Sequence, residues 1–329
     1  MRTLGRWIAS FALALSAAAS SQTYQPPRHT QPPPMIVDGS PMEVLERADA
    51  GTQIERGRSP AEELEEHRKL DRALHALLPQ RPGTVDAYVV AIALDSDPVF
   101  AREARVAGQV LGRRYGAAGR TIVLAGSDGS GPSQLPRGTP ETLAIVLARL
   151  AELMDRREDV LILYSTSHGA PVGLFYHDGD NGYGLISPNR LAGMLDGLGL
   201  RNRLLILSAC YAGVFVPRLH SDTTAILTAA SFDRSSFGCV AENDWTFFGD
   251  PMINHALRKP QPLAAAFAEA AHLVAGWEAQ LRVRPSQPQS SIGAGAARWL
   301  DALEQHIPPT ATEPVGRPAF SAAQAVPSH

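Results

Sequence analysis

The sequence has few cysteines, and their scarcity excludes two kinds of stabilisation. Its 329 residues include only two, Cys210 and Cys239. Two thiols cannot supply a disulfide framework, and alone they cannot provide the four thiolate or imidazole ligands of a Cys-rich zinc site. We therefore interpret each cysteine as a thiol. The sequence predicts no cofactor and no metal site.

An excess of basic residues is also absent. The chain has 30 Lys and Arg against 33 Asp and Glu, which gives a formal charge of −3. Proteins that hold nucleic acid by counterion release need a strongly basic surface, so no nucleic-acid partner is expected. Hydrophobic residues make up 44% of the chain and charged residues 19%. This composition is typical of a globular protein with a buried core.

No apolar run reaches the roughly 20 residues that a helix needs to span a bilayer. The first run, Trp7 to Leu15, follows Arg2 and Arg6 and passes into small residues at 16–20. A basic region, a short apolar region and small residues form the pattern of a cleavable signal peptide. We expect residues 1–19 to be removed, so that the protein is exported, periplasmic or secreted, with no membrane span after cleavage. The alternative is an uncleaved membrane anchor.

Composition also divides the rest of the chain. Residues 20–42 are rich in Pro, Gln and Ser, which predicts an extended linker. Residues 43–306 are expected to form a single domain with a leading helix over 60–78. Residues 307–329 are expected to form a disordered tail.

Short apolar runs alternate with helical patterns through the predicted domain, and this alternation indicates an α/β fold. Runs without polar residues are typical of strands buried on both faces, so we expect a three-layer sandwich with a mostly parallel sheet and helices on both faces. The expected strands are 88–94, 121–125, 160–164, 204–207 and 225–229; the expected helices are 101–115, 139–156, 188–198, 262–281 and 296–306; and a hairpin joins 174–176 to 183–186.

A histidine and a cysteine follow two consecutive expected strands. His168-Gly169 comes after the strand at 160–164, and Cys210 comes after the strand at 204–207. Because the carboxyl ends of parallel strands meet at one edge of a sheet, both side chains should lie close together. An imidazole beside a thiol can accept its proton and make it nucleophilic, and backbone N–H groups near Gly169 and Cys210 can hold an oxyanion. The alternative is a buried structural cysteine and an ordinary loop histidine.

The two motifs, Leu161-Ile-Leu-Tyr-Ser-Thr-Ser-His168-Gly169 and Ser208-Ala-Cys210-Tyr-Ala-Gly213, resemble those of the legumain-like C13 cysteine peptidases, whose fold is caspase-like. A third stretch, from Ser235-Ser236-Phe237-Gly238-Cys239 to Gly249-Asp250, is similar to the substrate-pocket region of that family. The resemblance implies that Cys210 is the nucleophile, His168 the general base and Gly169 an oxyanion-hole contributor. It also implies a set of substrate-binding residues: Ser208, Ser235, Ser236, Phe237 and Asp250.

The departures from the family concern substrate preference. Ser208 stands where the asparaginyl-specific members carry an acid, and the arginine expected after the first strand is replaced near Val99. Asp250 is then the remaining pocket charge, so an Arg or Lys side chain at the cleaved bond should fit at least as well as Asn. The alternative is that Asp250 only braces the pocket strand, in which case a small or apolar residue would be accepted. The accessory asparagine of the family falls near Asp97, to which we assign no role.

Three functions fit these residues. The first is an exported cysteine endopeptidase that acts on peptide or protein substrates through a thioester acyl-enzyme. The second is a transpeptidase that uses the same Cys–His pair, and the third is a catalytically silent binding module of the same fold. The catalytic hypotheses require Cys239 to be buried or out of reach of Cys210, whereas the even cysteine count alone would allow a structural disulfide. The sequence does not define an oligomeric state.

Overall fold

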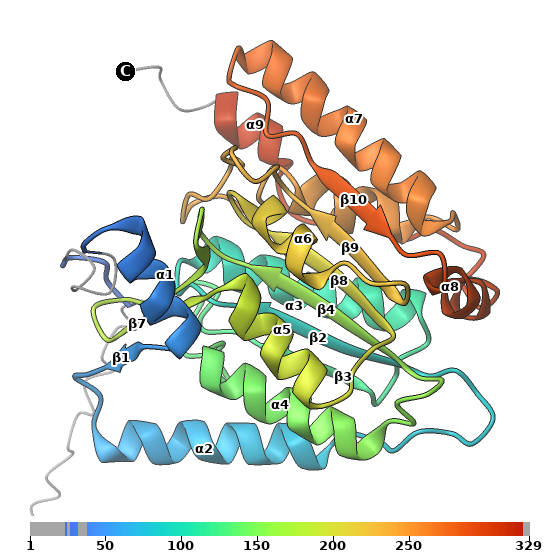
Figure 1. The fold of residues 1–329 in the computed structure, drawn as a ribbon. Helices are drawn as coiled ribbons and strands as arrows, with labels where there is room; N and C mark the ends of the chain where they lie inside the picture. The colour runs from blue at the N-terminus through green and yellow to red at the C-terminus, as the bar shows by residue number, and fades with distance from the viewer. Residues whose placement is uncertain (1–23, 25–26, 32–37, 325–329) are drawn as a thin grey trace, which may run out of the picture.

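The core of the protein is a six-stranded sheet with the strand order β10-β9-β8-β4-β2-β3 (Figure 1). The computed structural model describes residues 24, 27–31 and 38–324. Five of the strands are parallel to their neighbours, and β10 pairs antiparallel with β9 at one edge. The strands are β2 (Ala87–Ala93), β3 (Thr121–Leu124), β4 (Val160–Thr166), β8 (Arg203–Ser208), β9 (Thr224–Thr228) and β10 (Gln289–Ile292).

The central strands are buried on both faces, as their unbroken apolar sequence predicts. In β2, Val89 and Ala91 pack into the core on one side of the sheet, whereas Val90 and Ile92 pack into the core on the other side. The first core includes residues of α3 (Pro98–Arg114), α7 (Leu263–Leu281) and α8 (Ala296–Glu304). The second includes residues of α2 (Pro60–His75), α4 (Pro140–Leu153) and α5 (Pro188–Gly197). The predicted three-layer α/β sandwich with a mostly parallel sheet is therefore confirmed.

Several helices begin with the same local signal, a proline after a residue that favours helix N-termini. The pairs Ser59-Pro60, Thr139-Pro140 and Ser187-Pro188 start α2, α4 and α5, and each capping hydroxyl accepts a backbone N–H. The helices are α1 (Pro41–Ala50), α2 (Pro60–His75), α3 (Pro98–Arg114), α4 (Pro140–Leu153), α5 (Pro188–Gly197), α6 (Val216–Leu219), α7 (Leu263–Leu281), α8 (Ala296–Glu304) and α9 (Ala319–Gln324), with 3-10 turns η2 (Ala212–Phe215) and η4 (Ala256–Arg258) and a π-helical turn η3 (Asp250–His255).

A smaller antiparallel sheet has the order β1-β7-β6-β5. It contains β1 (Gln53–Glu55), β5 (Gly169–Ala170), β6 (Gly173–Asp178) and β7 (Gly182–Ile186). The hairpin predicted for this region is β6–β7. Because β5 directly follows His168, this sheet fixes the backbone on one side of the candidate site.

The predicted limits of the domain need two corrections. The linker expected over 20–42 ends earlier, because Ser40 and Glu43 form a capping box that starts α1 at Pro41. The tail expected to be disordered from residue 307 is ordered through Gln324. The Val315 carbonyl accepts hydrogen bonds from Trp245 Nε1 at 2.8 Å and from Asn254 Nδ2 at 3.0 Å, and Ala319 is fully buried.

The predicted signal peptide, residues 1–19, lies outside the described residues. Among the helices that the structure describes, none combines the length and apolar character that crossing a bilayer requires.

Candidate active site

The pairing register of three neighbouring strands brings the candidate residues together. Ala93 at the end of β2 pairs with Thr166 of β4, and Thr166 pairs with Ser208 of β8. Asp95, His168 and Cys210 each stand two residues beyond these aligned positions. The structure thus places His168 and Cys210 at the same edge of the sheet, as predicted, and adds the loop after β2 to the site.

The Cys210 sulfur lies among groups that stabilise its thiolate. The Ser236 backbone N–H donates to Sγ at 3.2 Å. A hydrogen bond from Cys239, together with this N–H and the positive charge of His168, lowers the pKa of Cys210 to about 6, although burial opposes the shift. Tyr211, the next residue, has φ 58°, a left-handed conformation that is strained for a non-glycine residue. Such a turn after a nucleophile is typical of functional sites.

The His168 ring is positioned by Asp97 and Phe100. Asp97 Oδ2 lies 4.0 Å from Nε2, and the Phe100 ring packs edge-on at 5.1 Å between ring centroids. Burial disfavours the imidazolium, but the nearby carboxylates of Asp97 and Asp95 outweigh it and raise the pKa of His168. Asp97 is the N-cap of α3 but makes no side-chain cap hydrogen bond, so its carboxylate can serve His168.

Gly169 allows the two catalytic loops to approach each other. A Cβ at this position would collide with the carbonyl oxygen of Cys210. The Gly169 backbone therefore lies directly beside Cys210, where its N–H is a candidate oxyanion donor.

The pocket residues expected on the segment 235–237 differ in their placement. Ser235 is exposed and contributes a hydrogen bond that lowers the pKa of Cys210, so it lies at the site. Ser236 reaches Cys210 through its backbone rather than its hydroxyl. Phe237 packs on the core and against Phe247, with 5.9 Å between ring centroids.

Ser208 contacts a buried carboxylate that the sequence analysis missed. Its hydroxyl lies 3.1 Å from Glu103 Oε1 and 3.1 Å from Thr246 Oγ1. Glu103 is fully buried and also accepts hydrogen bonds from Tyr164, Thr166 and the Thr246 backbone. Glu103, on α3, thus places an acid next to Ser208, the position at which the asparaginyl-specific enzymes have an acidic residue.

Asp250 does not have the environment expected of a pocket floor. It is fully buried, and its carboxylate accepts hydrogen bonds from Asn254 Nδ2 at 2.9 Å and from the Ala319 backbone N–H at 2.8 Å. Oδ2 thus holds the C-terminal segment, while Oδ1 is engaged by Asn254 and has His255 Nε2 at 3.3 Å. The expected preference for Arg or Lys depended on this carboxylate and loses its basis.

Comparison with known proteins relates the central part of the chain to a protein family. Residues 141–294 match the family model described as the Peptidase C13 family. This match confirms the resemblance seen in the motifs and supports a cysteine-peptidase-like function.

The matched C13 segment includes His168, Cys210 and the 235–239 stretch, whereas Asp97 and Glu103 precede it. No curated protein matches the chain. Among solved structures, caspase-1 from Spodoptera frugiperda is similar with a TM-score of 0.42 and 13% sequence identity, over 66% of this chain and 88% of that one.

Cys239 interacts with Cys210, although the catalytic hypotheses expect it to be buried or out of reach. Both cysteines are free thiols, so the alternative of a structural disulfide is not seen. Cys239 is partly buried against Phe100 and other apolar residues, as expected of a filler, but it also hydrogen-bonds Cys210. That contact raises the pKa of Cys239 well above its ordinary value, which keeps this thiol protonated as a donor.

Cys239 should therefore control the ionisation of the nucleophile. We expect Cys239→Ala to raise the pKa of Cys210 by about one unit or more, because a hydrogen bond to a charged group contributes roughly 1.5–3 kcal/mol. Absorbance titration of the thiolate measures this pKa. Cys239→Ser, which keeps a hydroxyl donor, is the matched control, and an identical Cys210 titration in wild type and Cys239→Ala would contradict the assignment.

Asp97 should act as a positioning residue for His168. We expect Asp97→Asn to lower the pKa of His168, because it removes the charge that favours the imidazolium. The alkaline limb of the pH–rate profile should move to lower pH, and kcat/KM near neutral pH should fall about tenfold, the equivalent of one pKa unit.

Asp301→Asn, at an exposed position on α8, provides the control for Asp97→Asn. A merely structural role for Asp97 would change the rate without moving the alkaline limb, and that result would remove the residue from the catalytic arrangement.

Proposed function

We propose that the protein is a cysteine endopeptidase that cleaves peptide or protein substrates through Cys210 and His168. The observation that carries this proposal is the register of β4 and β8, which places His168 and Cys210 two residues beyond a directly paired position at the same edge of the sheet. The pKa of Cys210 is lowered to about 6 and that of His168 is raised. Both shifts favour the thiolate and imidazolium pair, the form that attacks an amide and then protonates its leaving group.

The reaction follows from these charges. The Cys210 thiolate attacks the substrate carbonyl carbon, and the carbonyl oxygen becomes an oxyanion that the Gly169 backbone N–H is placed to stabilise. The His168 imidazolium gives its proton to the departing amine, so the amide bond breaks and a thioester forms on Cys210. Neutral His168 then removes a proton from a water molecule while the water oxygen attacks the thioester carbon. The C–S bond breaks, which releases the carboxylic acid and the Cys210 thiolate.

The charge pair predicts a bell-shaped pH dependence. Activity should rise as pH increases through about 6, because the thiolate forms, and it should fall as His168 loses its proton above its raised pKa. A pH–rate profile of kcat/KM measures both limbs.

A diverse peptide library read by mass spectrometry tests the proposed reaction, with Cys210→Ala protein as the blank. Internal cleavage by wild type alone supports an endopeptidase. New peptide bonds between library members would instead support the transpeptidase, in which an amine resolves the thioester. If the wild type forms neither product while its Cys210 still reacts rapidly with an alkylating agent, both activities are contradicted and the silent binding module is favoured.

We propose further that the protein is exported, periplasmic or secreted. The support is the sequence of residues 1–19, with its basic, apolar and small-residue regions. Expression of the full chain, cell fractionation and mass spectrometry of the mature amino terminus test this proposal. Recovery from the exported fraction with cleavage near residue 19 is expected, and an intact Met1 in the cytoplasmic fraction would contradict it.

A further inference from the structure

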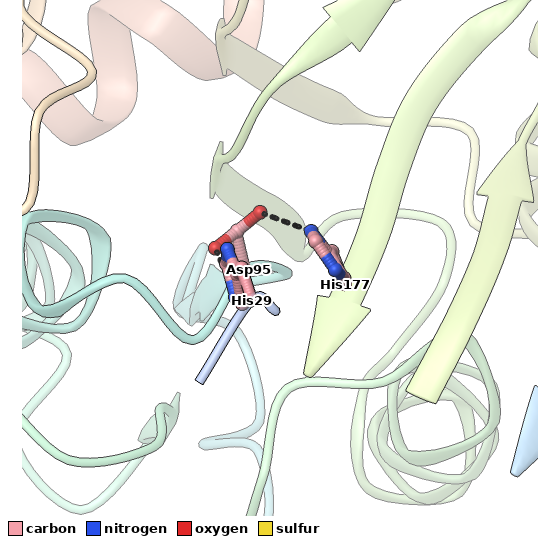
Figure 2. A group of neighbouring side chains, drawn as sticks. All are labelled: His29, Asp95 and His177. Carbon is pink, nitrogen blue, oxygen red and sulfur yellow. Dashed lines mark ion pairs between the residues drawn. The ribbon is translucent and has the colours of Figure 1, made fainter. Parts of the chain in front are cut away.

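Beside the candidate active site, two histidines and an aspartate from three separate segments converge (Figure 2). His29 comes from the segment before α1, Asp95 from the loop after β2, and His177 from β6. One ligand atom from each residue lies within 4.8 Å of the others. The Asp95 carboxylate is in the middle, with Oδ1 3.8 Å from His29 Nε2 and Oδ2 3.7 Å from His177 Nδ1.

The backbone holds two of these residues in place. The His177 N–H donates to the Leu94 carbonyl at 2.9 Å, and the Ser96 N–H donates to the His177 carbonyl at 2.9 Å. These bonds form an isolated bridge between Asp95 and His177, so β6 is fixed against the loop after β2. The fold itself therefore builds the Asp95–His177 pair, to which the segment before α1 adds His29.

Two buried polar atoms of the cluster lack the partners that burial normally requires. Asp95 Oδ2 and His177 Nε2 have no hydrogen-bond partner, and the Asp95 side chain is 0% exposed. A buried carboxylate or imidazole nitrogen without a partner carries a free-energy cost, and such an atom in a native structure indicates an unfilled requirement. A cation bound beside Asp95 Oδ2, on the side that His177 Nδ1 faces, would satisfy the carboxylate oxygen.

The ligand set defines the class of ion. Two imidazoles and one carboxylate suit Zn²⁺ and similar divalent transition metals, whereas Mg²⁺ and Ca²⁺ prefer sites made of oxygen. We propose that His29, Asp95 and His177 bind one divalent transition-metal ion, with Zn²⁺ as the representative. The rings of His29 and His177 are stacked, with 3.8 Å between centroids, so His29 must turn for its lone pair to meet that of His177 at a common ion. His29 Nε2 lies 2.9 Å from Ser96 Oγ, so this rotation would exchange that hydrogen bond for the metal ion.

The proposed metal site is linked to the proposed peptidase by Asp97. Its Oδ1 lies 3.7 Å from His29 Nδ1, and its Oδ2 lies 4.0 Å from His168 Nε2. A doubly positive ion bound beside Asp97 would oppose the positive charge of His168, so metal binding should lower peptidase activity. The expected inhibition rests on the proposed peptidase function, whereas the proposed metal binding itself does not.

Binding is tested with Co²⁺ and Zn²⁺ on full-length Cys210→Ala protein, which removes the catalytic thiol as a competing ligand. We expect one ion per chain by equilibrium dialysis, and Co²⁺ should give the intense visible absorption of a four-coordinate site. His177→Gln and His29→Gln in this background should each weaken binding at least tenfold, since loss of even an outer-shell partner costs about 10–100-fold. His272→Gln, at an exposed position on α7, is the matched control and should bind as the parent does.

Several results would overturn the proposal. They are no stoichiometric binding, Co²⁺ spectra of a six-coordinate aqueous ion, or equal affinity in the His177→Gln and His272→Gln proteins. For the activity statement, Zn²⁺ should inhibit the wild type more strongly than His177→Gln. Equal inhibition of the wild type and His177→Gln would show that Zn²⁺ acts at Cys210. That outcome would overturn the regulatory link, whereas the binding measurements decide whether the metal site exists.

Discussion

Replacing Cys210 or His168 with alanine is expected to lower kcat by at least about a thousandfold, because each removes a group that the chemical step requires. The two losses should not add, since the thiolate and the imidazolium act as one unit. A fluorogenic peptide taken from the products of the library experiment provides the assay. The double variant should be about as inactive as either single variant.

Both variants should remain folded, which separates this result from a loss of structure. Cys210 and His168 are at the carboxyl edge of the sheet, and their side chains are only partly buried. Circular dichroism and the midpoint of thermal unfolding should match the wild type within a few degrees. Retained turnover in Cys210→Ala would exclude this residue as the nucleophile.

Alkylation offers an independent check on the same pair. In wild-type protein, iodoacetamide should modify Cys210 much faster than Cys239, because the first thiol has its pKa lowered to about 6 and the second has its pKa raised. His168→Ala should slow the modification of Cys210 near pH 7 by removing the positive charge. Equal labelling rates for the two cysteines would contradict this account of the site.

The arrangement of the catalytic pair could be predicted because buried parallel strands have a simple sequence signature. The runs at 160–164 and 204–207 have no polar interruption, and the rule that active sites lie at the carboxyl ends of such strands then selects His168 and Cys210. The same reasoning applied to the run at 88–94 selects Asp95 and Asp97. The loose alignment of this loop within the family gives Asp97 no role, whereas the register of the strands places it at the candidate site.

The environment of Asp250 could not be predicted from the sequence. A carboxylate near a predicted pocket looks the same in sequence whether it faces substrate or another part of the chain. The deciding partner is Ala319, in a tail whose composition predicted disorder, so the contact could not be foreseen. Short β1 and the edge strand β10 were missed for a related reason, since their partly exposed residues lack a continuous apolar run.

Glu103, in contrast, carried a signal in the sequence that was overlooked. Phe100, Ala104, Ala107 and Leu111 are spaced as one face of a helix, and Glu103 lies on that face. An acid inside an apolar helical stripe must be buried, and a buried acid must be hydrogen-bonded. The sequence therefore indicated a polar network beneath α3, although not its partners.

Loss of this network should produce the largest change in stability. Glu103 accepts hydrogen bonds from Tyr164, Thr166 and Ser208 and from the Thr246 backbone, so Glu103→Ala leaves four buried donors without their acceptor. Each orphaned donor costs roughly 1–3 kcal/mol, although the hydroxyls can partly turn toward one another. We expect the free energy of unfolding to fall by about 3–5 kcal/mol, as for other broken buried networks.

Thermal and urea unfolding measure this loss. The melting midpoint of Glu103→Ala should fall by about 10 °C, since 1 kcal/mol corresponds to roughly 2–4 °C in a domain of this size class. Ser208→Ala is the matched control, because it removes one donor and leaves the acceptor in place, and it should cost only about 1 kcal/mol. Because Ser208 is two residues from Cys210 and hydrogen-bonds Glu103, Glu103→Ala should also weaken activity at temperatures where the protein is still folded. An unfolding free energy within 1 kcal/mol of wild type would show that the four donors find other partners, and the buried acid would then have no structural role at the site.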